Sequence, residues 1–250
     1  MAELPLPQLL TAATLLARAA QWDAARALLE SAEVSPAEGP GFALALADLA
    51  VDQDFAQRTT HSPAALAALA TLELTPTQAW DRALLDLRHS YFLKLLTPAP
   101  DEALATQAKT LEATAPDDSR RATILFYQGL IADNLNALPQ EAFTRYSASL
   151  ALCNTTGDTL QASYAHRHLG DHAHTAGDLP RARTHWQLST EQRQTAGHVP
   201  ATLAQQALLA VLAKDEGNQE AAKALATEVN RWAHQLHIPY LQDQTEPLLG

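Results

Sequence analysis

Cysteine, glycine and aromatic residues are all scarce in this sequence. Cys153 is the single cysteine of 250 residues, so no disulfide can form within the chain, and we expect a reducing, cytoplasmic environment. Only nine residues are glycine and 6% are aromatic, whereas alanine and leucine are abundant. This composition favours helices, and the absence of alternating polar and apolar runs argues against strands.

Basic side chains are also in short supply. Seventeen lysines and arginines stand against 28 acidic residues, which gives a formal net charge of −11. Because affinity for nucleic acid comes largely from neutralising phosphates, this balance argues against direct binding of DNA or RNA, and also against anionic membranes. No apolar run reaches the roughly 20 residues of a membrane span. The opening residues MAELPLPQLLTAATLL lack the basic region of a secretory signal.

What the sequence does contain is a repeat of about 40 residues. A small, a large and a second small side chain recur at spacings of four and three, most clearly as Ala182, Trp186 and Ser189. These spacings place the three side chains on one face of a helix. The leading alanines of six such patterns are 39 or 40 residues apart: Ala25, Ala64, Ala103, Ala142, Ala182 and Ala222.

Helix breakers divide each repeat into two helices. Proline precedes the leading alanine in four repeats, at a position where a helix start tolerates its missing N–H, and a second breaker opens the other helix. We therefore predict an all-α chain with helices at 6–20, 22–34, 41–52, 63–73, 76–96, 100–114, 118–136, 139–154, 158–176, 179–196, 200–216 and 218–237. They form units at about 6–40, 41–75, 76–116, 117–156, 157–199 and 200–238 of a single domain, 1–250, in which 239–250 is a C-terminal cap or tail.

Residues 163–196 resemble a tetratricopeptide repeat (TPR). The matching residues are an apolar residue with glycine on the first helix, Gly-Asp in the turn, and the small-large-small pattern on the second: Leu169, Gly170, Gly177, Asp178, Ala182, Trp186 and Ser189. The resemblance covers essentially the whole chain and implies a right-handed α-solenoid of about six units. The long units also look like the helical arrays of large bacterial LuxR-type and antibiotic-regulatory transcription activators. This chain has no GxxxxGK[ST] loop and no basic recognition helix.

Four of the ten histidines lie in HRHLGDHAH, residues 166–174. On a helix, His166 and His172 flank a buried stripe on opposite sides, and His174 lies on the polar face. The stripe comprises Ala162, Leu169, Ala173 and Ala176. Only His168 and His172 have the spacing that presents two zinc ligands, and no third ligand is well placed. We therefore predict no metal and no cofactor. Ser163 and Ser189 lack the sharp turn that exposes a nucleophile, so we predict no catalytic residue and no enzymatic activity.

In solenoids of this kind, the first helix of each unit lines the concave surface. The resemblance implies that this surface carries a mixed set of aromatic, apolar and charged residues: Tyr91, Phe126, Leu130, Asp133, Asn134, Tyr164, Arg167, Asp171, His174 and Lys214. Such a lining suits a peptide, with Arg167 available for a carboxylate. The alternative is that Arg167 and Asp171 pair with each other on a solvated helix face.

The sequence thus predicts a non-catalytic scaffold that binds a protein or peptide through its concave face, with a regulatory role. Two other hypotheses stay open. One is a sensor of a small-molecule effector or signalling peptide, as the likeness to activator arrays implies. The other is an enzyme whose catalytic residues were recruited onto the concave face, because the site and not the fold decides function.

Overall fold

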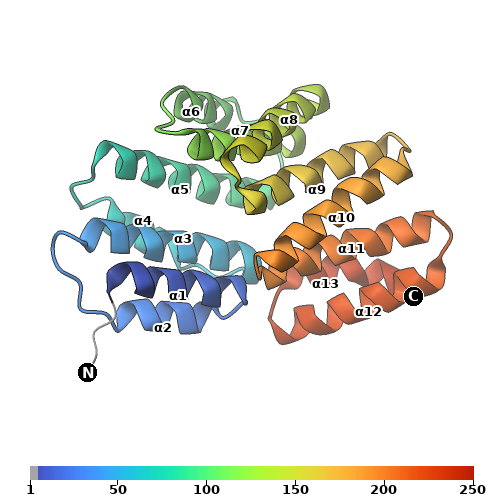
Figure 1. Cartoon of the computed structure of the whole chain (residues 1–250), viewed down its shortest axis with the longest axis horizontal. Coiled ribbons are helices and arrows are strands. Elements are labelled where there is room, and N and C mark those ends of the chain that lie inside the picture. The colour runs from blue at the N-terminus through green and yellow to red at the C-terminus, as the bar shows by residue number, and fades with distance from the viewer. Residues whose placement is uncertain (1–4) are drawn as a thin grey trace. The chain divides into compact units, whose positions relative to one another are not determined.

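The computed structural model describes residues 5–250, in which all regular structure is helical (Figure 1). Residues 1–4, the start of the predicted domain, lie outside the described residues. Every helix expected from the sequence is present, and the tail forms a further helix and a 3₁₀ turn. The helices are α1 Leu6–Arg18, α2 Trp22–Glu30, α3 Gly39–Gln57, α4 Ser62–Leu69, α5 Pro76–Leu95, α6 Glu102–Ala113, α7 Asp118–Asn134, α8 Pro139–Thr156, α9 Thr159–Thr175, α10 Leu179–Thr195, α11 Val199–Asp215, α12 Gln219–Gln235, α13 Pro239–Thr245 and η1 Glu246–Leu248.

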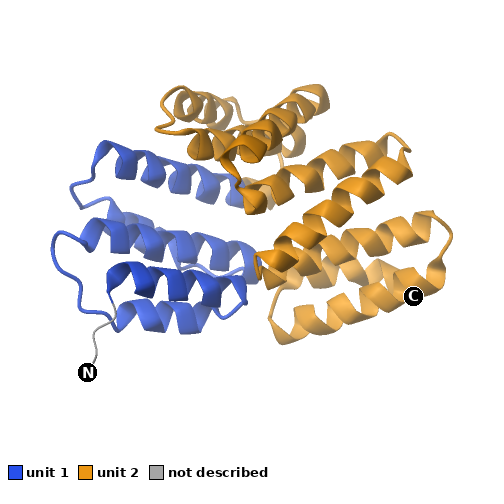
Figure 2. Cartoon of the chain, viewed as in Figure 1, with its two compact units in different colours: residues 1–93 blue, residues 94–250 orange. Residues whose placement is uncertain are grey.

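The chain divides into two compact units, residues 1–93 and 94–250, shown in different colours in Figure 2. The division falls near the end of α5, so that the first unit holds α1–α4 with most of α5 and the second holds α6–α13. A single domain was predicted, and it stays a prediction. None of the helices in residues 5–250 is long and apolar enough to cross a membrane.

The first unit differs from the prediction at several helix ends, since α2 ends at Glu30 and not at residue 34, and α4 ends at Leu69 and not at residue 73. The polar stretch VDQDFAQRTTHSP, residues 51–63, interrupts this part of the sequence, and the third helix was predicted to end at residue 52, but α3 continues to Gln57. The residues between α3 and α4 form a turn beside the Asp54 carboxylate. This carboxylate accepts hydrogen bonds from the Ser62 hydroxyl at 2.6 Å and the His61 amide at 2.8 Å. Although burial raises the pKa of Asp54, these bonds hold it below its usual value. The Asp54 carboxylate therefore connects α3 to the start of α4, and the polar residues do not end α3 at residue 52.

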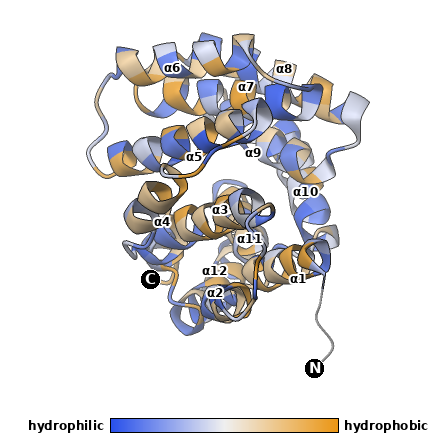
Figure 3. Ribbon diagram, turned by 90° about the vertical axis from the view of Figure 1, so that its left-hand side faces the viewer, coloured by the Kyte–Doolittle hydropathy of each residue, from blue (hydrophilic) through white to orange (hydrophobic). Residues whose placement is uncertain are grey.

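In the second unit, successive helices pack against each other from α6 to α13, and the first helices of neighbouring pairs also touch, α7 with α9 and α11 with α13. Figure 3 shows polar and apolar residues alternating along the helices, as expected where each helix buries one face. This stacking of helix pairs is the arrangement of an α-solenoid.

Glycine and a large aromatic residue form the contact between the two helices of a pair. Trp186 on α10 is 1% exposed and lies against Gly170 of α9, where a Cβ would come within 2.4 Å of the indole ring. Tyr146 on α8 covers Gly129 of α7 in the same way. The helix face predicted to carry Ala182, Trp186 and Ser189 is therefore a buried one. Ala176, predicted in the buried stripe, is exposed because α9 ends at Thr175 and Ala176 belongs to the turn.

Candidate functional site

Eight of the ten predicted site residues lie on α7 and α9 of the second unit. Phe126, Leu130, Asp133 and Asn134 are on α7, and Tyr164, Arg167, Asp171 and His174 are on α9. These two helices pack against each other, so most of the predicted set lies on neighbouring elements. Lys214 is exposed near the end of α11. Tyr91 lies on α5 in the first unit and is 2% exposed, so little of its ring is open to a ligand.

An aromatic cluster lies between α7, α8 and α9. The ring centroid of Phe126 lies 5.8 Å from that of Tyr164 and 5.5 Å from the His168 imidazole. His168 in turn stacks on Tyr146 at 4.8 Å. Phe126 and Leu130 are each 7% exposed. Phe126 and Leu130, two of the four predicted contacts on α7, therefore mainly support the surface from beneath. The half-buried Tyr164 remains accessible.

The two aspartates of the site bond to neighbouring protein groups. Asp133 Oδ2 lies 3.0 Å from His172 Nε2, and Asp171 accepts a hydrogen bond of 3.2 Å from the Trp186 indole. Burial raises the pKa of Asp171. Asp171 does not form the ion pair with Arg167 that was weighed as the alternative, because its oxygens face Trp186 and His168. Both aspartates therefore hold neighbouring side chains in place.

The four histidines of HRHLGDHAH have four different surroundings. His166 Nδ1 lies 2.9 Å from His185 Nδ1, His168 stacks on Tyr146, His172 faces Asp133, and His174 Nε2 lies 2.7 Å from Asp215. Burial, and then the charge of His185, lower the pKa of His166 to about 4. In residues 5–250 no group of three or more His, Cys, Asp and Glu side chains could hold a metal ion. The predicted dispersal of the histidines around α9 is what the structure shows.

Arg167 in the middle of α9 and Arg193 near the end of α10 are close enough to interact electrostatically, and sequence reasoning found only Arg167. Arg167 Nη1 donates a long hydrogen bond of 3.4 Å to Gln205 Oε1. Arg193 of α10 is 2% exposed, and its Cζ lies 4.9 Å from the centroid of the Tyr164 ring. Within the described residues, neither guanidinium forms an ion pair with a carboxylate. Arg193 lies four residues after Ser189 and so continues the spacing of Ala182, Trp186 and Ser189. This spacing places Arg193 on the same helix face, and it is the feature of the sequence that indicates its burial.

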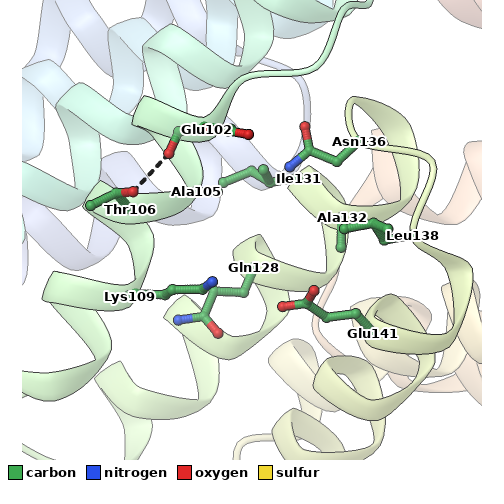
Figure 4. A pocket seen from close by; sticks show the side chains of 10 residues that line it. All are labelled: Glu102, Ala105, Thr106, Lys109, Gln128, Ile131, Ala132, Asn136, Leu138 and Glu141. Carbon is green, nitrogen blue, oxygen red and sulfur yellow. Dashed lines mark hydrogen bonds between the residues drawn. The ribbon is translucent and has the colours of Figure 1, made fainter.

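A shallow groove of about 300 Å³ lies elsewhere in the second unit, between α6, α7 and the start of α8 (Figure 4). Gln128 is buried in its wall and donates from Nε2 to the carbonyl oxygen of Ala108, whereas its Oε1 atom has no hydrogen-bond partner. None of the predicted site residues lines this groove. The lining residues are Glu102, Ala105, Thr106, Lys109, Gln128, Ile131, Ala132, Asn136, Leu138 and Glu141.

No protein-family model matches the chain, and no curated protein matches it in sequence. Among solved structures, it is similar to a Rap protein complexed with competence and sporulation factor, with a TM-score of 0.66 and 13% sequence identity. The match covers 95% of this chain and 68% of the Rap chain. At this identity the likeness concerns the fold. The chain is therefore an all-α protein with a TPR-like helical-repeat fold of the α-solenoid type.

Proposed function

We propose that the chain is a non-catalytic scaffold that binds a protein or peptide partner on the surface formed by α7 and α9. We call this surface the α7–α9 face and define it by Asp133, Asn134, Tyr164, Arg167, Asp171 and His174, all of them exposed or half-buried. The fold of the chain is similar to that of a Rap protein complexed with competence and sporulation factor, and this likeness supports a binding role.

The observation that carries the proposal is the state of Arg167. Its guanidinium is half-buried and makes a single long hydrogen bond, to Gln205, among the described residues. A half-buried cation that forms no direct ion pair has lost part of its hydration without a carboxylate in contact, so a ligand group that supplies one binds favourably. The ring of Tyr164, one helical turn earlier, adds an amphipathic contact of the kind that dominates protein interfaces.

The histidine and acidic neighbours give the face a fixed shape. His174 bonds to Asp215 of α11, and His172 bonds to Asp133 of α7, so α9 is linked to the first helix on either side. A surface whose side chains are already ordered loses less conformational entropy on binding. This order favours a scaffold that receives a partner with little rearrangement.

The enzyme hypothesis finds little support in the serines. Ser163 and Ser189 are fully buried, and each donates its hydroxyl to a backbone carbonyl, of Leu160 and of Ser163 respectively. Ser62 lies 2.9 Å from His89 Nδ1, a distance that would suit a nucleophile and its base. However, Ser62 is also fully buried, and its hydroxyl bonds to Asp54 at the start of α4. Its role there is to hold the helix end.

A sensor of a small-molecule effector is the second candidate, and the groove beside α6 favours it. The groove offers an apolar floor at Ile131 and Ala132, and the unpartnered Gln128 Oε1 in its wall would accept a hydrogen bond. The likeness to transcription-activator arrays and the cytoplasmic location remain predictions from the sequence. Calorimetric titration with a set of metabolites separates this candidate from a pure scaffold, because only a sensor gives a saturable heat of binding with a small molecule.

The scaffold proposal is tested by partner capture. Immobilised wild-type chain and an Arg167→Glu variant are exposed to the same cell extract, and captured proteins are quantified by mass spectrometry. We expect the variant to lose at least about tenfold in capture of a specific partner, equivalent to about 1.4 kcal/mol.

Lys223→Glu is the matched control, because it makes the same charge change at an exposed position of α12. This control should capture the partner as well as the wild type does. A partner that binds the Arg167→Glu variant with unchanged affinity would show that the functional surface lies elsewhere.

A further inference from the structure

Arg193 is a buried charged side chain that forms no ion pair with a carboxylate among the described residues. It is 2% exposed, and its two printed hydrogen bonds go to neutral oxygens: Nε donates to the Ser163 hydroxyl at 3.2 Å, and Nη1 donates to the carbonyl of Ala201 at 2.8 Å. Proteins rarely bury an arginine unless a carboxylate, phosphate or other anion compensates its charge. Within residues 5–250 no carboxylate forms an ion pair with it.

A second cation lies nearby. Burial, and the charge of Arg167, lower the pKa of Arg193 to about 10, while the nearby Tyr164, Tyr240 and Asp171 partly offset them. The acidic group among these is Asp171, whose oxygens face Trp186 and His168. In a chain of net charge −11, two neighbouring arginines that form no direct ion pair with a carboxylate are unusual.

We propose that Arg167 and Arg193 together form a carboxylate-binding site, and that the partner of the α7–α9 face presents a carboxylate to it. This inference rests on the proposed binding function and names the chemistry that the face recognises. Half-buried Arg167 makes the direct contact, since its planar guanidinium matches a carboxylate in a bidentate manner. Arg193 lies behind it as a positioning residue and adds positive potential.

The neighbouring residues hold both guanidinium groups in place. Gln205 is fully buried, accepts from Arg167 Nη1, and donates from its Nε2 to the carbonyl of Trp186. The Tyr164 ring lies beneath the Arg193 guanidinium. The acidic Asp171 near both arginines favours a monoanion over a doubly charged phosphate, because like charges repel.

The test uses the full chain and four small probes, two of which differ only in the carboxylate. The probes are N-acetyl-dialanine as the free acid, the same compound as its C-terminal amide, N-acetylglutamate α-amide, and inorganic phosphate. NMR signals of the arginine Nε–H groups, assigned through the variants, report binding at each guanidinium. We expect saturable shifts of Arg167 and Arg193 with a carboxylate probe and none with the dialanine amide. The stronger of the two carboxylate probes identifies a chain terminus or an acidic side chain as the natural source.

Variants separate a charge effect from a structural one. Arg167→Gln should weaken carboxylate binding about tenfold, the loss expected for a charge-assisted pair, whereas Arg183→Gln should not change it. Arg183 is the matched control because it pairs with Glu216. Arg193→Met should weaken binding about threefold, with Arg193→Lys closer to wild type, as expected if the charge matters. A purely structural Arg193 would make the Met and Lys variants lose binding alike.

Three results would overturn the inference: equal binding of the dialanine acid and amide, tighter binding of phosphate than of either carboxylate probe, or unchanged affinity in Arg167→Gln. If carboxylate binding is absent while Arg167→Glu still abolishes partner capture, only this inference fails. If capture is also unaffected, the proposed function fails with it.

Discussion

Gly170→Ala should destabilise the second unit even though alanine is the better helix former. A Cβ at this position would lie 2.4 Å from both Cδ1 and Nε1 of Trp186. The ring cannot easily move away, because it is 1% exposed and its N–H donates to the Arg167 carbonyl at 2.9 Å. Overpacking of this kind costs about 1–3 kcal/mol, and the helix propensity of alanine returns about 1 kcal/mol. We expect a net loss of up to about 2 kcal/mol in the free energy of unfolding.

The same substitution should have the opposite sign once the ring is gone. Trp186→Ala alone should cost about 3–5 kcal/mol, the usual range for deleting a buried aromatic side chain. In that background the added methyl group meets no indole, so Gly170→Ala should stabilise by up to about 1 kcal/mol. The double-mutant cycle should therefore give a coupling energy of about 2 kcal/mol, measured by urea unfolding followed by far-UV circular dichroism.

Gly41→Ala serves as the control, because nothing lies within 4 Å of a Cβ built at that position of α3. It should be neutral or slightly stabilising. The equivalent pair Gly129 and Tyr146 should reproduce the change of sign. If Gly170→Ala has the same effect with and without Trp186, the helix contact inferred from the repeat register does not limit stability.

Two further predictions concern the histidines. The folded-state pKa of His166 is lowered from 6.5 to about 4, so the unfolded chain binds more protons in that window, and the free energy of unfolding should fall as the pH drops from about 6.5 to about 4. A His166→Asn, His185→Gln double variant should flatten this slope in urea titrations at several pH values; an unchanged slope would contradict the assignment. The purified chain should contain no stoichiometric zinc by elemental analysis, and one zinc per chain that disappears in His168→Ala would overturn that expectation.

Much of the fold could be read from the sequence because its determinants are local and repeated. The four-three spacing of Ala182, Trp186 and Ser189 places three side chains on one helix face wherever it occurs. Glycine tolerates the left-handed turn at Gly177, with φ of 78°, and Asp178 caps the following helix through a hydrogen bond to the Arg181 amide. Each of these signals acts within a few residues, so no knowledge of distant contacts is needed.

Only the tertiary structure decided which polar groups find partners inside the protein. The sequence allowed Arg167 to pair with Asp171 one turn away, but Trp186 of the next helix bonds to that carboxylate instead. Arg193 lies in the buried register, yet a charged residue is expected to be exposed unless something compensates it. Its burial depends on the Ser163 hydroxyl and the Ala201 carbonyl, which lie on two other helices and meet only when α9, α10 and α11 pack. Cys153 and Ala233 occupy the position of Arg193 in the neighbouring repeats, so the repeat pattern does not predict these hydrogen bonds, and the electrostatics of the site follow from the packing.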